Sequence, residues 1–352
     1  MRKTTLTGIL FLSLIGVAEA CTDFRLISND NKVMVTRTME FALPLDSHVR
    51  SSPQGREFKY GLNWTSKLGY VYMDALGQDM AVDGMNEAGL SFEFLYLPGE
   101  TEYQKAPAGA EVQSLPYIHL GDWVLSNFKT VDEVVEALKS IYVVEYTDAS
   151  LDNRLFPLHA SIFERSGKGI VVEFVGGKVN IHEHIGVFTN APTYEWHVTN
   201  LRNYISMSPY SPAPIIANGV AYAATGQGQG MLGLPGDSSP PSRFVKIAVM
   251  AKTAVTPANA KELLQTSTHI INTVDIPLGS IRAKVDGKDQ LELTQWTVFK
   301  NLTDNVLYYR SYADSTLRSV SLHEVPLTPG SARINIPLSN EQPVVNMISS
   351  VH

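Results

Sequence analysis

A single cysteine, Cys21, stands directly after a segment that has the layout of a secretory signal peptide. With one cysteine the chain cannot form an intramolecular disulfide, nor a zinc site built from several thiolates. The rest of the composition is globular, because 44% of the 352 residues are hydrophobic and only 18% are charged. This length allows one large domain or two ordinary ones.

The N-terminal segment is expected to be removed from the mature protein. Arg2 and Lys3 form a basic region, an apolar run covers residues 6–18, and Ala18-Glu19-Ala20 is an A-x-A cleavage site. The run is shorter than the ~20 apolar residues of a membrane-spanning helix, and no other segment could span a bilayer. We therefore expect a signal peptide over residues 1–20, export to the periplasm, and no membrane anchor. A buried N-terminal helix is the alternative.

Cleavage after Ala20 would make Cys21 the first residue of the mature chain. Cys21 could then be acylated, as in a lipoprotein, could be a buried structural residue, or could be an N-terminal nucleophile. A free thiol with a pKa of ~8.5 is mostly protonated at neutral pH, and an α-amino group with a pKa of ~7.7–8.0 can accept its proton. The third interpretation therefore needs no histidine, and it makes processing the activating step.

The mature chain has the pattern of strands, then helices, then strands. Alternating and β-rich runs predict strands at residues 21–28, 33–41, 68–76, 80–84, 90–97, 169–175, 185–189, 293–300, 306–312 and 317–325. A capping box at Thr130 and Glu133 predicts one helix to about Lys139, and Thr256-Pro257 predicts another to about Gln265. This order favours one α+β domain over residues 21–352, with largely antiparallel sheets.

Other kinds of site find little support. The net charge of −7 without a basic block argues against a nucleic-acid partner. Residues 228–233 match G-x-G-x-x-G, but Pro235, Pro240 and Pro241 follow, so no helix is expected to open there and a dinucleotide site is disfavoured. The loop 225–241 is instead expected to be mobile or to face substrate. His182 and His184 lack an identifiable third metal ligand, so no metal site is expected.

Four blocks together resemble the choloylglycine hydrolase family of N-terminal nucleophile hydrolases. Cys21 is followed 16 residues later by R-T-M-E-F, and the other blocks are DGMNEAGL (83–90), FTNAPTY (188–194) and GLPGDSSPPSRF (233–244). They occur in the family's order. The resemblance implies an αββα four-layer sandwich and an amidohydrolase that forms a thioester on an N-terminal cysteine, without metal or cofactor. It also implies a homo-oligomer, commonly a tetramer.

The resemblance assigns catalytic roles to three residues of the first two strands. Cys21 is the nucleophile, and its amine is the base. Arg37 lies beside the thiol, where its positive charge favours the thiolate. Glu40 takes the position of an Asp that contacts the amine in the family. Considered alone, Arg37 and Glu40 could equally form an ordinary ion pair.

Three further residues complete the catalytic set that the resemblance implies. The side chain of Asn190 and the backbone N–H of Tyr96 form the oxyanion hole, and Arg243 lies near the nucleophile. Considered alone, Asn190 could cap a turn, Tyr96 could be a core residue and Arg243 a surface residue. Bile salt hydrolases tend to have Asn at the position of Tyr96, whereas penicillin V acylases have Tyr.

The substrate is expected to be a small amide with an apolar acyl group. Met39, Phe41, Leu43 and Phe94 are the candidate acyl-binding residues, because they lie near the nucleophile and are apolar. The exported branch of the family suggests penicillin V or N-acyl homoserine lactones. Conjugated bile salts are the alternative substrate. A non-catalytic periplasmic binding protein or a lipoprotein is the alternative of another class.

Overall fold

The computed structural model describes residues 20–285 and 287–347. The predicted signal peptide, apart from Ala20, lies outside these residues. The described chain is built around two large antiparallel sheets.

The first sheet has six strands and contains β1, the strand that starts at Cys21. In spatial order these are β14 (Val187–Phe188), β1 (Cys21–Ile27), β2 (Val33–Glu40), β19 (Thr294–Asn301), β20 (Val306–Ser311) and β21 (Arg318–Ser321). Each neighbouring pair is antiparallel. The strands predicted at residues 293–300 and 306–312 are β19 and β20, and they pair as an antiparallel hairpin. Every residue of β2 is buried, which places this strand at the centre of the protein.

The second sheet has eight strands and supplies the opposite wall of the core. In spatial order these are β13 (Lys178–Glu183), β12 (Gly169–Val175), β11 (Leu158–Phe163), β8 (Ser91–Tyr96), β7 (Gln78–Asn86), β6 (Tyr70–Ala75), β3 (His48–Ser52) and β22 (Asn335–Pro337). Its pairs are also antiparallel. The inner faces of the two sheets meet and bury most of the large apolar side chains.

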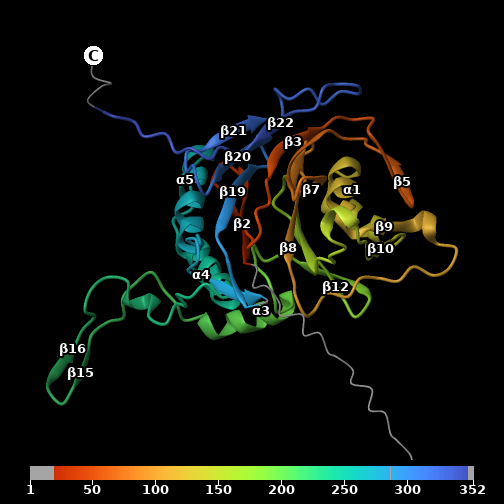
Figure 1. Cartoon of the computed structure of the whole chain (residues 1–352). Helices are drawn as coiled ribbons and strands as arrows, with labels where there is room; N and C mark the ends of the chain where they lie inside the picture. Colours follow the sequence, from red (N-terminus) through yellow and green to blue (C-terminus); the bar gives the residue numbers. More distant parts are fainter. Residues whose placement is uncertain (1–19, 286, 348–352) are drawn as a thin grey trace, which may run out of the picture.

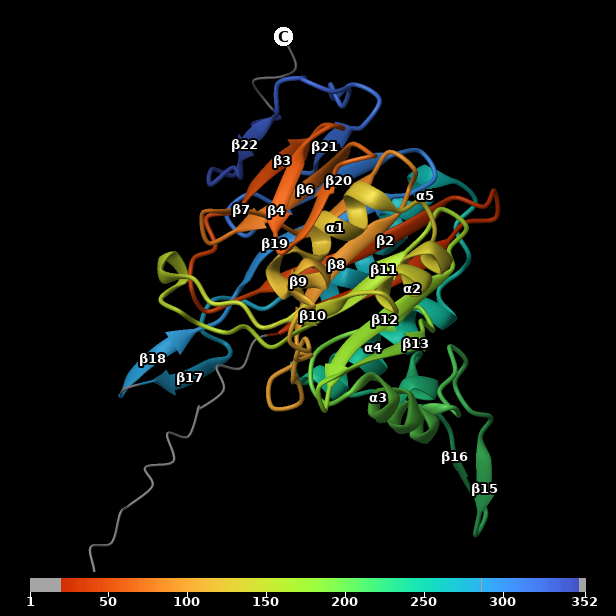
Figure 2. The same ribbon diagram turned by 90° about the vertical axis from the view of Figure 1, so that its right-hand side faces the viewer.

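Helices cover both outer faces, so the layers follow the order α, β, β, α (Figure 1). Helices α4 (Pro240–Thr253) and α5 (Ala260–Ile271) pack on the six-stranded sheet. Helix α1 (Leu120–Asn127) packs on β7 and β8 of the other sheet, and α2 (Val131–Leu138) lies on the same side (Figure 2). The expected four-layer α+β sandwich is confirmed.

Short elements surround this sandwich. Helix α3 (Tyr194–Leu201) follows β14. The minor strand pairs are β4 (Glu57–Tyr60) with β5 (Leu62–Thr65), β9 (Ser114–Pro116) with β10 (Tyr142–Val144), β15 (Ile215–Ala217) with β16 (Val220–Tyr222), and β17 (Arg282–Val285) with β18 (Lys288–Leu291). The β15–β16 hairpin projects from the body of the molecule (Figure 1).

Four predictions of local structure were wrong. The second predicted helix begins at Ala260, because the side chain of Asn259 caps it, and it runs on to Ile271. A helix does open after the glycine-rich stretch, since Pro240 and Pro241 occupy the first turn, where a missing N–H costs nothing. The strand expected over residues 185–189 is only Val187–Phe188, and the strand expected over residues 317–325 is only Arg318–Ser321. The predicted capping box of α2 is confirmed.

Candidate active site

The thiol of Cys21 lies at the start of β1 on the inner face of the six-stranded sheet. Cys21 pairs directly with Met39 of β2, so both side chains point to the same face. The Cys21 Sγ is 3.9 Å from Met39 Sδ and 4.0 Å from the carbonyl oxygen of Glu40. Only 3% of Cys21 is exposed.

The guanidinium of Arg37 contacts this thiol from the neighbouring strand. Its Nη2 lies 3.5 Å from Cys21 Sγ and donates to the carbonyl oxygen of Phe94 at 2.5 Å. Nη1 lies 3.5 Å from Asp83 Oδ2, and the guanidinium carbon is 4.8 Å from the ring centroid of Trp296. A fully buried cation therefore has a fixed place beside the sulfur.

Burial and charge act on the thiol in opposite directions. Burial raises the pKa of Cys21 above its ordinary value, and the positive charge of Arg37 opposes that rise. Arg37 thus favours the thiolate as expected, but burial has the larger effect on the pKa. The thiol needs an adjacent base, and the amine that cleavage would free lies on the same residue.

Asn190 joins the backbone nitrogen of Cys21 to the end of β8. Its Oδ1 accepts a hydrogen bond from Cys21 N at 2.6 Å, and its Nδ2 donates to the carbonyl oxygen of Tyr96 at 2.9 Å. One Nδ2 hydrogen is used in that bond, which leaves the amide a second hydrogen to donate. The structure thus brings Asn190 and Tyr96 together at the nucleophile.

Arg243 reaches the same place from α4, on the outer face of the sheet. Its Nη1 donates to the carbonyl oxygen of Cys21 and to Thr22 Oγ1, and its Nη2 donates to Asn190 Oδ1 at 2.8 Å. Its Nε donates to the carbonyl oxygen of Ser238 at 2.9 Å, which ties the end of the 225–241 loop to the site. The position of Arg243 near the nucleophile is as predicted.

The carboxylate of Glu40 points away from the thiol. Side chains alternate along a strand, so Glu40 lies on the opposite face of β2 from Met39. Its Oε1 accepts from Thr294 Oγ1 at 2.6 Å, while its Oε2 has no hydrogen-bond partner among the described residues. Burial raises the pKa of Glu40 to about 8, although the charges of Arg243 and Arg37 oppose the rise.

The predicted contact between Glu40 and the amine of Cys21 is not formed in the uncleaved chain. There the nitrogen of Cys21 is an amide, and it donates to Asn190. An amide nitrogen carries one hydrogen, so no second bond is available to Glu40. The contact stays a prediction for the cleaved chain, in which the nitrogen gains hydrogens.

Two buried histidines hold the backbone around Asn190, and no sequence pattern predicted either of them. His159 of β11 bonds the carbonyl oxygen of Thr189 through Nε2 at 3.0 Å and Glu173 Oε1 through Nδ1 at 3.1 Å. His197 of α3 bonds the carbonyl oxygen of Asn190 through Nε2 at 2.8 Å. No sequence motif links these strands and this helix, so only the fold brings them together.

An almost wholly apolar pocket opens at the sulfur. Three of the four predicted acyl-binding residues line it, and Leu43 does not. The lining residues are Cys21, Arg37, Met39, Phe41, Leu45, Ala75, Leu76, Met80, Val82, Phe94, Leu95, Tyr96, Ile118, Phe156 and Leu158. Beyond the end of β2 the chain leaves strand geometry, so Leu45 rather than Leu43 turns inward. Leu43 is half-buried, and its carbonyl oxygen accepts from Gln295 Nε2 at 2.6 Å.

A sequence model for linear amide C–N hydrolases of the choloylglycine hydrolase family matches residues 21–337. The chain belongs to this family. It is 31% identical over 314 residues to a bile salt hydrolase/transferase of Clostridium perfringens, an overlap of 86% of this chain and 93% of the relative. It is 32% identical over 216 residues to a penicillin V acylase of Pectobacterium atrosepticum, an overlap of 56% of this chain and 57% of that protein.

Solved structures of the family share the fold. A variant of conjugated bile acid hydrolase from Clostridium perfringens superimposes with a TM-score of 0.83 at 27% identity, covering 93% of this chain and all of the other. Penicillin V acylase from Agrobacterium tumefaciens gives a TM-score of 0.73 at 24% identity and 90% coverage of each chain, which shows the fold alone. The protein is thus an amidohydrolase of the choloylglycine hydrolase family.

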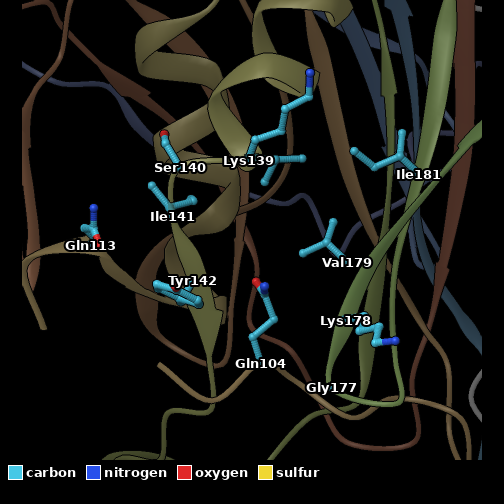
Figure 3. Close-up of a pocket in the computed structure, with 11 residues that line it drawn as sticks. Gln104, Gln113, Lys139, Ser140, Ile141, Tyr142, Gly177, Lys178, Val179 and Ile181 are labelled. Atoms are coloured by element: carbon cyan, nitrogen blue, oxygen red, sulfur yellow. The ribbon is translucent and has the colours of Figure 1, made fainter. Parts of the chain in front are cut away.

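A cavity larger than the pocket at the sulfur lies elsewhere and is not the reaction site of this family member. It has a volume of about 430 Å³ and lies between α2, β10 and β13 (Figure 3). Its walls carry Lys139, Tyr142 and Lys178 but no thiol. Over residues 20–285 and 287–347, no group of three or more His, Cys, Asp or Glu side chains is placed to hold a metal ion. Within the same ranges, no helix has both the length and the apolarity to cross a membrane.

Proposed function

We propose that this amidohydrolase removes apolar acyl groups from penicillin V and from N-acyl homoserine lactones. The observation that carries the proposal is the apolar pocket beside the Cys21 sulfur. Met39, Phe41 and Phe94 contribute a thioether and two aromatic rings to it. Such walls suit an aromatic or long aliphatic acyl group, whereas the polar amine part of the substrate would face outward.

The proposed reaction has two steps with a thioester between them. The Cys21 sulfur attacks the amide carbonyl carbon while the thiol proton passes to the freed amine of Cys21. Asn190 Nδ2 and the backbone N–H of Tyr96 hold the oxyanion, and such a donor is typically worth ~2.7–4 kcal/mol. The C–N bond breaks as the leaving amine takes that proton. Water, activated by the same amine, then attacks the thioester and releases the carboxylic acid and the thiol.

Conjugated bile salts are the second candidate substrate. The 31% identity to a bile salt hydrolase/transferase over 86% of the chain favours them. Tyr96 argues for the acylase, because the family's bile salt hydrolases tend to have Asn at that position. Tyr96 lines the pocket, so the residue at this position also bears on which acyl group fits.

Export and cleavage are part of the proposal, because the base of the reaction is a free amine. Signal peptidase would cut between Ala20 and Cys21 and deliver the mature enzyme to the periplasm. The mass of the secreted protein tests this directly. A mass that starts at unmodified Cys21 supports the hydrolase, and a diacylglyceryl adduct would instead identify a lipoprotein.

The protein is further proposed to be a homo-oligomer. Exposed apolar side chains gather on the β15–β16 hairpin, which projects from the body (Figure 1). Strand β21 also forms an open edge of the six-stranded sheet. Both features are typical of surfaces that a second subunit covers.

Release of a primary amine from three substrates in parallel tests the proposed function. The mature protein is offered penicillin V, a long-chain acyl homoserine lactone and glycocholate, with Cys21→Ala as the blank. Cleavage of the first two but not the third is expected. Preferred cleavage of glycocholate would make bile salts the substrate. No cleavage of any of them, with free Cys21 confirmed by mass, would contradict the proposal and favour a non-catalytic role or another amide.

A further inference from the structure

A cluster of charged side chains is buried between the two sheets and reaches the thiol through Arg37. Lys300 of β19 binds two carboxylates from the opposite sheet. Its Nζ lies 2.7 Å from Asp83 Oδ1 and 2.6 Å from Glu93 Oε1. All three side chains are 0% exposed. Ion pairs are rarely excluded from solvent so completely, because removing charges from water is costly.

This cluster is continuous with the nucleophile. The other oxygen of Asp83, Oδ2, lies 3.5 Å from Arg37 Nη1, and Arg37 Nη2 lies 3.5 Å from Cys21 Sγ. A chain of contacts therefore runs from Lys300 through Asp83 and Arg37 to the sulfur. Each link joins groups that the fold, and not the local sequence, has brought together.

The remaining charged group of the cluster is Asp23 on β1. Its Oδ2 accepts from Ser161 Oγ at 2.6 Å and lies 3.5 Å from His184 Nε2. Burial holds the pKa of His184 well below its ordinary value, so this imidazole is neutral. Two cations, Arg37 and Lys300, thus face three carboxyl groups. The cluster therefore has fewer cations than carboxyl groups. A carboxylate that is not paired with Lys300 would compete with the Cys21 sulfur for the charge of Arg37.

We propose that Lys300 is a positioning residue for the nucleophile. By binding Asp83 and Glu93 it neutralises them, and it leaves the guanidinium charge of Arg37 available to the Cys21 sulfur. Without Lys300, Arg37 would be the remaining cation in contact with Asp83. The charge of Arg37 would then stabilise Asp83, and the thiolate would lose its counterion. The inference rests on the proposed role of Cys21, but its test measures thiol ionisation and needs no substrate.

The rate of Cys21 alkylation by iodoacetamide, followed against pH in the mature protein, is the test. Because Cys21 is the only cysteine, every alkylated molecule reports this one thiol. Lys300→Met is expected to move the midpoint of the profile upward by about one pH unit. Burial raises the pKa of Glu93 to about 8 and also raises the pKa of Cys21, so Glu93 is ionised over the range in which the thiol titrates. Glu93→Gln removes that negative charge and is expected to move the midpoint downward. Lys300→Arg, which keeps the charge, should stay near the wild type.

Opposite shifts distinguish a charge effect from a packing effect. If Lys300 were merely structural, both substitutions would disturb the core and act in the same direction. Shifts of the same sign, or no shift in either variant, would overturn the proposal. If Lys300→Met does not fold by circular dichroism, Glu93→Gln decides alone, since only a downward shift agrees with the proposal.

Two more variants complete the design. The double variant Lys300→Met with Glu93→Gln removes one charge of each sign, so its midpoint is expected to return toward the wild type. Lys59→Met is the matched control, because Lys59 forms an exposed ion pair with Glu57 at 2.8 Å. Its midpoint should not move. Opposite shifts without turnover of penicillin V would support the role of Lys300 while rejecting the proposed substrate.

Discussion

At the scale of single residues, the site depends on two faces of one strand pair. Cys21 and Arg37 point between the sheets, whereas Glu40 and Thr22 point toward α4 and its Arg243. The sulfur therefore lies in an apolar cavity, while the nitrogen of the same residue lies among polar groups. The proposed mechanism uses this separation, because it makes one residue the nucleophile on one side and the base on the other.

A free amine on Cys21 is the first requirement to test. Adding one uncleavable residue before Cys21 should reduce turnover by about 10²–10⁴, because the general base is then an amide. Cys21→Ser should also lower turnover strongly, since a hydroxyl is a far weaker nucleophile than a thiol. Both are measured as amine release from penicillin V. Full activity in either protein would contradict the mechanism.

The side chain of Asn190, as a donor to the oxyanion, is the second requirement to test. Asn190→Ala removes one oxyanion donor and is expected to lower kcat by about 10²–10³. Asn203→Ala, at an exposed position on the segment after α3, is the matched control and should retain activity. A fall in both variants, or in neither, would argue against an oxyanion hole at Asn190.

At the scale of elements, three separate segments meet at one loop. His159 of β11 bonds the carbonyl oxygen of Thr189, and His197 of α3 bonds that of Asn190. Arg243 of α4 donates to the side chain of Asn190. Asn190 follows β14, a strand of only two residues, so its own element does little to fix it. Its position depends on neighbours from the other layers.

His197 is expected to position Asn190 without touching substrate. Burial lowers the pKa of His197 to about 4, so the ring is neutral and Nε2 donates to the carbonyl oxygen of Asn190. His197→Ala should lower kcat about tenfold with little change in KM, because a misplaced donor costs rate more than binding. His197→Gln, which keeps a donor, should recover part of the loss. His269→Ala, exposed on α5, is the control; an equal loss there would reject the role.

At the scale of the whole molecule, the protein buries several carboxyl groups. Burial raises the pKa of Asp23 and of Glu292 to about 7, and that of Glu40 and of Glu93 to about 8. In each case the folded state holds a proton more tightly than the unfolded chain does. The stability that these protons contribute is present below about pH 4 and is lost as the pH rises to about 8.

Glu292 offers the clearest test of this pH dependence. It is 1% exposed, and neither carboxylate oxygen has a hydrogen-bond partner among the described residues. Ionising it at pH 8 should cost up to about 3 kcal/mol, so Glu292→Gln should lose less stability than the wild type between pH 5 and pH 8. The free energy of unfolding in urea at both pH values measures this. An equal or larger loss in the variant would show that Glu292 does not titrate in this range.

The β15–β16 hairpin should decide the oligomeric state. Ile216 lies near the tip of the hairpin and is 78% exposed, and Val220 is also exposed. The double change Ile216→Ser and Val220→Ser removes apolar surface without touching the site. The mass measured by light scattering is therefore expected to fall below that of the wild-type oligomer. The same change at Leu278 and Val255, which are exposed elsewhere, should leave the mass unaltered. An unchanged mass in the hairpin variant would place the interface elsewhere.

The sequence by itself determined the chemistry of the site. A lone cysteine after a predicted cleavage site, followed by ordered family blocks, identified Cys21, Arg37, Asn190 and Arg243 as candidate site residues, and the strand patterns predicted the antiparallel sheets. Local signals suffice for such features, because hydrophobic periodicity and motif order are written along the chain. They failed at α4, where first-turn prolines look like helix breakers, and at Leu43, where the strand had already ended.

Only the tertiary structure decided which groups share an environment. His159, His197, Lys300 and Glu93 carry no motif, and they act on the site through contacts between residues far apart in the chain. The tertiary structure also decided the balance at the thiol, where burial outweighs Arg37 in setting the pKa. Burial depends on how layers pack, and charge interactions depend on distance and on exclusion of water, so neither can be obtained from residue order alone.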